Sequence, residues 1–330
     1  MPVVQVLDST MTYQEVGAGV PLVFLHGNPT SSYVWRRVMP RIGAPGRCLA
    51  PDLIGMGESG KPPVRYRFAD HARYLDAWFD ALDLDRVVLV GHDWGGALAF
   101  DWAARHPGRT RGVAFMETIV RPMRWDDLPA TARPVFESFR TPGVGESMIL
   151  DQNVFIEQAL PATVVTALTD EDMSAYRRPY PTPESRLPLL QWPRELPLDG
   201  APADVVARVE AYDAWLADSP QVPKLLLTFD PGPGTMMGPA VIEWPAANIA
   251  SLDIVGCGHA GHHAPEDQPE AIAAAIVARG SPAADSAGRR RRGRLRHRQG
   301  RVDIARIWLP SVSRGRLVRG RRLGVGGSGK

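Results

Sequence analysis

The sequence predicts an α/β fold, in which a mostly parallel central sheet is flanked by helices and a helical cap is inserted into it. Short apolar runs alternate with amphipathic segments from residue 11 to about 120. The runs lack the period-2 alternation of half-exposed strands, which is expected of parallel strands covered on both faces. Residues 121 to about 218 are instead rich in Pro, Trp and charged side chains, which indicates an insertion.

The first elements follow the order of a strand, a crossover helix and a parallel strand. Residues 21–25 and 86–90 (Pro-Leu-Val-Phe-Leu and Arg-Val-Val-Leu-Val) are expected to be buried strands. Between them, residues 68–82 place apolar side chains at three- and four-residue steps, which is typical of an amphipathic helix. A helix over 94–106 and a strand over 111–116 continue the alternation, which favours a mostly parallel sheet.

Strand patterns return only after the insertion. Residues 224–229 and 251–255 are apolar runs that we expect to extend the same sheet. Within the insertion, 202–216 has a helical pattern, and 269–279 is expected to be the last helix of the sheet domain. The simplest organisation is therefore one sheet interrupted by a cap.

Four segments follow from this pattern: a core over 1–120, a helical cap over 121–218, a second part of the core over 219–280 and a tail over 281–330. The tail holds 15 of the 38 Lys and Arg residues and 2 of the 36 Asp and Glu residues. The tail therefore carries a net charge of +13, and the rest of the chain carries −11. Like charges with few apolar neighbours are typical of disorder, so we expect a disordered tail.

The most informative segment is 90–96, Val-Gly-His-Asp-Trp-Gly-Gly, between a predicted strand and a predicted helix. A sharp strand-to-helix turn needs small flanking residues and exposes the central side chain at the carboxyl end of the sheet. Here that residue is Asp93, and a carboxylate can form an ester with carbon that water then hydrolyses. The alternative is a loop aspartate that only caps the helix at Trp94.

A second loop, 26–35, follows the first predicted strand. In folds with such a turn, this loop supplies a backbone N–H to the oxyanion. The side-chain amide of Asn28 could also donate to an anion, whereas Asn28-Pro29 could equally be a simple turn.

Several short motifs together resemble the haloalkane dehalogenases, a family of α/β hydrolases. The resemblance covers roughly residues 10 to 280, and it rests on 28–32 (NPTSS), 51–57 (PDLIGMG), 91–96 (GHDWGG), 115–122 (FMETIVRP) and 176–180 (YRRPY). It implies that Asp93 is the nucleophile, Glu117 the catalytic acid after the sixth strand, and Asn28 with Trp94 the halide-stabilising pair. Neutral N–H donors suit the negative charge that develops on a departing halide.

The acid has a competing candidate. Many α/β hydrolases place the third triad member after the following strand, where Asp230 and Gly232 lie. We favour Glu117 because the family register puts Gly232, and not Asp230, nearest to that alternative position.

The general base must follow the last strand, where the sequence offers more than one histidine. Family members carry one His, followed at +4 and +5 by Glu-Asp and at +7 by Pro. Counting back from Glu266 and Asp267 leads to His262, whereas counting forward from the expected strand end at Val255 favours His259. We choose His262, because the downstream match runs without a gap into the last helix.

The other histidines are expected to be inert. His263 is taken as a neighbour of the base without a catalytic role, and His71 as a residue on a polar position of its helix. The His-rich loop lacks the spacing to Cys or Glu partners that a zinc site needs, so no metal is expected. The resemblance implies no cofactor either; the expected partners are a small halogenated alkane, water and the halide product.

Two rival functions remain at this point. An epoxide hydrolase of the same fold would need cap tyrosines, for which Tyr176, Tyr180 and Tyr212 are candidates, but Asn28 and Glu117 argue against it. Nucleic-acid binding through the Arg-rich tail is a rival of another class. The acidic body offers it no basic face, and the tail could equally be a frame-shifted or readthrough extension.

The cysteine content and the hydropathy of the chain indicate its cellular compartment. Cys48 and Cys257 are the only cysteines, which indicates a reducing environment without a disulfide framework. No run of roughly 18 apolar residues predicts a membrane span, and the N-terminus lacks the pattern of a signal peptide. We therefore expect a cytoplasmic protein, either a monomer or a homodimer.

Overall fold

The computed structural model describes residues 1–43, 46–129 and 132–278, and its centre is a sheet of eight strands in the order β1-β2-β4-β3-β5-β6-β7-β8. Strands β3 to β8 run parallel to one another, whereas at one edge β1 pairs antiparallel with β2, and β2 pairs antiparallel with β4. The predicted mostly parallel sheet is therefore confirmed. The strands are β1 (Val3–Val6), β2 (Ser9–Gly17), β3 (Val20–Leu25), β4 (Gly46–Pro51), β5 (Val87–His92), β6 (Thr110–Met116), β7 (Lys224–Pro231) and β8 (Leu252–Ala260).

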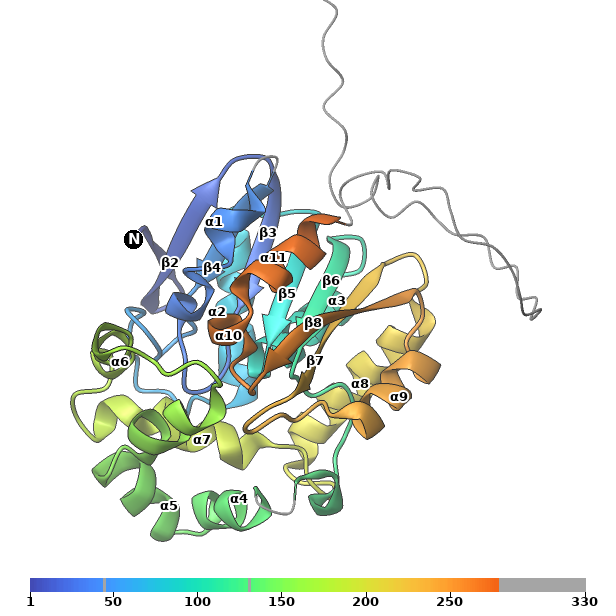
Figure 1. Ribbon diagram of the computed structural model, residues 1–330. Coiled ribbons are helices and arrows are strands. Elements are labelled where there is room, and N and C mark those ends of the chain that lie inside the picture. Colours follow the sequence, from blue (N-terminus) through green and yellow to red (C-terminus); the bar gives the residue numbers. More distant parts are fainter. Residues whose placement is uncertain (44–45, 130–131, 279–330) are drawn as a thin grey trace, which may run out of the picture.

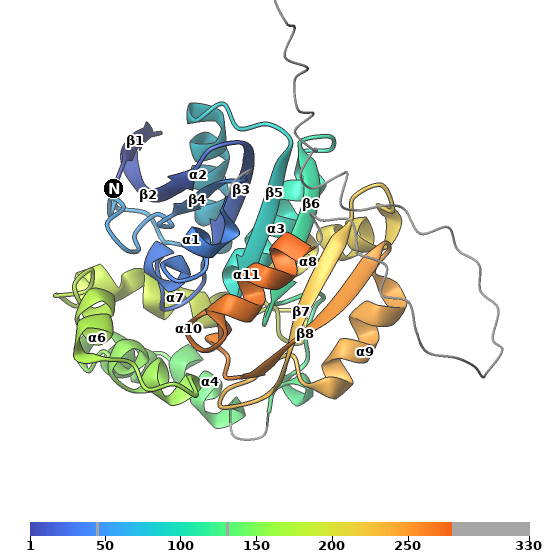
Figure 2. The same cartoon turned by 45° about the horizontal axis from the view of Figure 1, so that its top comes forward.

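Helices cover both faces of this sheet (Figures 1 and 2). One face carries α1 (Met39–Ile42) and α11 (Pro269–Ala278), and the other carries α2 (Phe68–Ala81), α3 (Trp94–Arg105) and α8 (Ala203–Asp218). Alternate residues of one strand serve the two layers: Val88 and Val90 pack in the cluster with α11, and Leu89 packs in the cluster with α3. Burial on both faces explains why these strands are apolar throughout.

The chain between β6 and β7 forms a group of helices beyond the carboxyl ends of the strands (Figure 1). Its helices are α4 (Arg133–Arg140), α5 (Val144–Glu146), α6 (Asp170–Arg177) and α7 (Leu187–Glu195). Helix α8, in the same stretch of chain, packs against α3, where Arg208 pairs with Asp101 at 2.9 Å. Helix α8 thus ties the inserted segment to the sheet.

The last strand departs from its predicted bounds. Strand β8 runs to Ala260 and does not end at Val255, and its pairing with β7 shifts register between Thr228 and Asp230. His259, expected in a loop, therefore lies on the strand. After β8 the chain forms α10 (Ala264–Asp267), and α9 (Pro239–Asn248) connects β7 to β8.

Several smaller findings bear on the sequence predictions. Cys48 and Cys257 are both buried free thiols. Among the described residues, no helix is long and apolar enough to cross a membrane. The predicted disordered tail over 281–330 lies outside the described residues.

Candidate active site

Asp93 stands at the turn between β5 and α3, as the sequence pattern predicted. Its backbone adopts φ 53° and ψ −131°, a strained conformation for a residue with a side chain. The flanking glycines make this turn possible: a Cβ on Gly91 would lie 2.4 Å from the Cα of Gly96, and one on Gly95 would lie 2.1 Å from the Leu25 carbonyl oxygen. Such strain is often kept at reactive residues, because it presents one side chain in a fixed direction.

The loop after β3 supplies a hydrogen bond to this carboxylate. The backbone N–H of Asn28 donates to Oδ1 of Asp93 at 2.7 Å, and the backbone N–H of Trp94 faces the same carboxylate. The side-chain amide of Asn28 donates weakly to the Leu189 carbonyl at 3.4 Å, and its Oδ1 is buried with no hydrogen-bond partner among the described residues. Asn28 and Trp94, the residues predicted to form the halide-stabilising pair, therefore lie beside Asp93.

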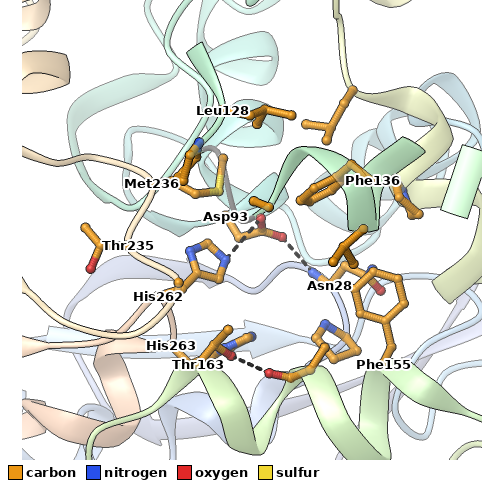
Figure 3. A pocket seen from close by; sticks show the side chains of 18 of the residues that line it. Asn28, Asp93, Leu128, Phe136, Phe155, Thr163, Thr235, Met236, His262 and His263 are labelled. Atoms are coloured by element: carbon orange, nitrogen blue, oxygen red, sulfur yellow. Dashed lines mark hydrogen bonds and ion pairs between the residues drawn. The ribbon is translucent and has the colours of Figure 1, made fainter. Parts of the chain in front are cut away.

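His262 lies between two carboxylates, those of Asp93 and Glu117, and Figure 3 shows its contact with Asp93. Its Nε2 is 3.5 Å from Oδ2 of Asp93, and its Nδ1 is 3.3 Å from Oε2 of Glu117. Burial disfavours the imidazolium, but the carboxylates of Asp93 and Glu117 outweigh it and raise the pKa of His262 to about 9. Burial also opposes ionisation of Asp93, and contact with His262 nevertheless lowers the pKa of Asp93. The two residues form an ion pair.

Glu117 is held by backbone amides of the loop after β7. The N–H of Met236 donates to Oε2 at 2.6 Å and the N–H of Met237 donates to Oε1 at 3.1 Å. With an exposure of 1%, this carboxylate is buried, and these hydrogen bonds offset the cost of removing its charge from water. The competing acid, Asp230, lies on β7 with its side chain exposed, and Gly232 lines the cavity without an acidic group.

The competing base lies elsewhere. His259 is exposed, and its Nδ1 is 3.1 Å from the carbonyl oxygen of Asp230 on the neighbouring strand. His263 lines the cavity next to His262, and its Nδ1 is 2.8 Å from the hydroxyl of Thr163. Only His262 among these three contacts both Asp93 and Glu117.

Asp93 and His262 line a cavity of about 550 Å³ between the sheet and the inserted helices. Asn28, Asp93 and His262 lie close together on its wall (Figure 3). Trp94 also lines it, and most of the other lining side chains are apolar. Leu128, Phe136, Phe139, Phe155, Pro193 and Leu196 form much of this apolar wall. A cavity of this kind admits an apolar substrate and weakens the hydration of the carboxylate.

The cap tyrosines do not reach this cavity. The hydroxyl of Tyr176 bonds to Glu266, that of Tyr212 donates to the Ile119 carbonyl at 2.7 Å, and that of Tyr180 is buried. None of the three is among the lining residues. The arrangement therefore offers an epoxide oxygen no tyrosine acid. The described residues also contain no group of three or more His, Cys, Asp or Glu able to hold a metal.

Two features of the site were not predicted from the sequence. The hydroxyl of Thr118 donates to the Asp93 carbonyl at 2.6 Å and so supports the turn from β6. His71, expected on a polar helix position, is 1% exposed and stacks on Trp192 with ring centroids 4.2 Å apart; that prediction was wrong because α7 covers this face of α2. Trp192 in turn stacks on Trp94 at 4.7 Å.

The chain is similar to known proteins over most of its length. Residues 20–153 match the family model of the alpha/beta hydrolase fold. A haloalkane dehalogenase of Mesorhizobium japonicum is 50% identical over 83% of this chain and 89% of its own length, and one of Sphingobium indicum is 46% identical over 83% and 93%.

Solved structures give the same picture. A haloalkane dehalogenase from Bradyrhizobium elkani is 49% identical, with a TM-score of 0.80, over 84% of this chain and 96% of its own. Another, from Agrobacterium tumefaciens, is 43% identical, with a TM-score of 0.79, over 84% and 94%. Given this identity over most of the chain, the protein belongs to the haloalkane dehalogenase family of α/β hydrolases.

Proposed function

We propose that this chain hydrolyses the carbon–halogen bond of haloalkanes through a covalent ester on Asp93. The observation that supports this most strongly is the meeting of Asp93, His262 and Glu117, of which Asp93 and His262 line a mostly apolar cavity. A buried carboxylate that faces apolar space is suited to attack saturated carbon, because little water competes for its lone pairs.

In the first step, an oxygen of Asp93 attacks the carbon that bears the halogen. The new C–O bond forms as the carbon–halogen bond breaks, and the bonding pair leaves with the halide. The side-chain N–H groups of Asn28 and Trp94 would stabilise this halide, since both residues line the cavity beside Asp93. Neutral donors of this kind bind an anion without a covalent bond and allow its later release.

In the second step, His262 takes a proton from water, and the hydroxide attacks the ester carbonyl of Asp93. The tetrahedral oxyanion would accept hydrogen bonds from the backbone N–H groups of Asn28 and Trp94. In the free enzyme the backbone nitrogen of Asn28 lies 2.7 Å from Oδ1 of Asp93. Collapse breaks the bond between the Asp93 carboxyl carbon and the alkoxy oxygen, which takes the proton of the added hydroxyl and leaves as the alcohol. The Asp93 carboxylate and the His262 imidazolium of the free enzyme are thereby restored. Glu117 would orient the ring of His262 and balance the charge of the imidazolium.

The two steps are linked through the charge on Asp93. In the free enzyme, burial is outweighed by both carboxylates, so the pKa of His262 is about 9 and the ring is protonated at neutral pH. Ester formation removes the Asp93 charge, which lowers the pKa of His262 and makes the neutral base available. Alkylation therefore prepares the base for the water that follows.

We further propose that 121–218 acts as the cap that covers the cavity and selects substrates. Leu128, Phe136, Phe139, Phe155 and Pro193 all line the cavity from this segment. Its helix α8 serves as the base of the cap, because α8 packs on α3. A cytoplasmic location and a monomeric or homodimeric state stay predictions from the sequence.

Halide release tests the proposal. Purified protein with a primary bromoalkane should release bromide and the matching alcohol in equal amounts, whereas an epoxide of similar size should remain intact. Asp93→Ala should abolish release, because it removes the only nucleophile in the turn. Epoxide hydrolysis without bromide release, or bromide release by Asp93→Ala close to the wild-type rate, would refute the proposal.

A further inference from the structure

The backbone of His262 is anchored at both of its polar groups. Its N–H donates to the Pro233 carbonyl at 2.9 Å, in the loop that also holds Glu117. Its carbonyl oxygen lies 2.7 Å from Nε2 of His92, the residue directly before Asp93. One hydrogen bond thus joins the end of β5, which carries the nucleophile, to the segment that carries the base, 170 residues later in the chain.

The geometry fixes the role of His92 in this bond. A carbonyl oxygen can only accept, so Nε2 of His92 must carry the proton. The side chain is fully buried, and Nδ1 has no partner among the described residues. Burial, reinforced by the charge of His262, lowers the pKa of His92 to about 4, so the ring is neutral with its one proton on Nε2.

This bond matters because the side-chain contacts of His262 are long. The ring lies 3.3 Å from Glu117 and 3.5 Å from Asp93, distances that leave it some freedom. Base catalysis depends on placement, and a shift of about 1 Å can cost roughly 100-fold in rate. Anchoring the main chain on both sides restricts that freedom where the ring contacts do not.

We propose that His92 is a positioning residue for the second step: its Nε2–H, by holding the carbonyl of His262, keeps the base aligned with the water that attacks the Asp93 ester. This inference rests on the proposed function. Alkylation does not need a base, so loss of the bond affects ester hydrolysis and leaves halide displacement nearly unchanged. A merely structural residue would affect both steps or neither.

The test compares two substitutions of His92 that differ in how far the side-chain N–H donor extends from the backbone. In His92→Gln the side-chain amide can occupy the place of Nε2 and donate to the same carbonyl. In His92→Asn the amide is one bond shorter and falls near Nδ1, so the donor is lost. His106→Leu is the control, since it removes a similar bond, from Nδ1 to the Trp102 carbonyl at 2.8 Å, at the far end of α3.

The assay is rapid-quench kinetics with a bromoalkane, in which the bromide burst counts folded, alkylated enzyme and intact mass follows the ester. His92→Asn should keep a burst rate within about threefold of wild type and hydrolyse the ester about 10- to 100-fold more slowly, so that ester accumulates. His92→Gln and the control should hydrolyse it within about threefold of the wild-type rate.

Ester hydrolysis by His92→Asn at the wild-type rate would overturn the inference. Ester hydrolysis slowed as much in His92→Gln as in His92→Asn would also overturn it. If His92→Asn does not fold and gives no burst, the rate of ester hydrolysis in His92→Gln is the test, and a slowing of about 10-fold or more there would overturn the inference. A wild-type chain that forms no ester and releases no bromide would refute the proposed function itself. The two failures are therefore distinguishable.

Discussion

The role assigned to Glu117 leads to a prediction with two separable effects. The carboxylate is 1% exposed and accepts hydrogen bonds from N–H groups of Met236, Met237 and His262. In Glu117→Gln, one carboxylate oxygen becomes an NH₂ group. That group must face at least one N–H donor, because both original oxygens accept from the protein. The substitution therefore leaves a buried donor unsatisfied and removes the charge that balances the imidazolium.

The structure sets the size of each effect. Charge-assisted hydrogen bonds contribute about 1.5–3 kcal/mol and an unsatisfied buried donor costs about 1–3 kcal/mol, so we expect a loss of about 2–4 kcal/mol in the free energy of unfolding. For a domain of this size that lowers Tm by about 3–7 °C. Ester hydrolysis should slow by about 100- to 10,000-fold, because the tautomer of His262 is no longer fixed.

The loss of stability should also depend on pH. The pKa of His262 is about 9 in the folded protein, above its ordinary value of 6.5. Protonated His262 therefore contributes fully to the free energy of unfolding below pH 6.5, and this contribution is lost as the pH rises through 9. Glu117→Gln weakens that contribution. The difference in stability between wild type and variant should therefore be larger at pH 6 than at pH 9.5.

Thermal melts and rapid-quench kinetics measure the two effects. Asp101→Asn is the control, because Asp101 is also a buried carboxylate, 3% exposed, whose partners are Arg105 and Arg208. It should lose stability without slowing ester hydrolysis. A Glu117→Gln protein that hydrolyses the ester as fast as the control does would refute the role given to Glu117.

Three further predictions follow from the site. His262→Phe should still release one equivalent of halide and accumulate an ester visible by intact mass, whereas His259→Phe should turn over; an ester only in the His259 variant would move the base there. Trp192→Leu should weaken halide binding about 3- to 10-fold in a fluorescence titration, because Trp94 loses its stacking partner at 4.7 Å, and unchanged affinity would contradict this. Removing 281–330 should leave activity intact, since every site residue lies before it; an inactive or insoluble product would show that the fold needs it.

The sheet and the nucleophile turn could be predicted because their signals are local. Apolar runs without alternation indicated strands covered on both faces, and the glycines around Asp93 indicated the strained turn. The family motifs added Glu117, Asn28 and Trp94, all of which lie beside Asp93 or His262. Each of these predictions needed only a short stretch of chain.

What could not be predicted depends on contacts between distant segments. The register shift opposite Thr228 extends β8 to Ala260, and no local pattern marks it, which is why counting from Val255 pointed to His259. His71 lies on an ordinary helix, and only the packing of α7 makes it buried. The bond from His92 to the base joins segments that have no common sequence signal.

The central claim is that Asp93 forms a covalent ester that water then opens, and a single turnover in H₂¹⁸O tests it most directly. Enzyme in excess over bromoalkane should yield alcohol without ¹⁸O, because the alcohol oxygen comes from the Asp93 carboxylate. The solvent oxygen should appear in that carboxylate, detected by mass in the peptide that contains Asp93. Alcohol labelled with ¹⁸O beside an unlabelled Asp93 peptide would show direct attack by water and contradict the account.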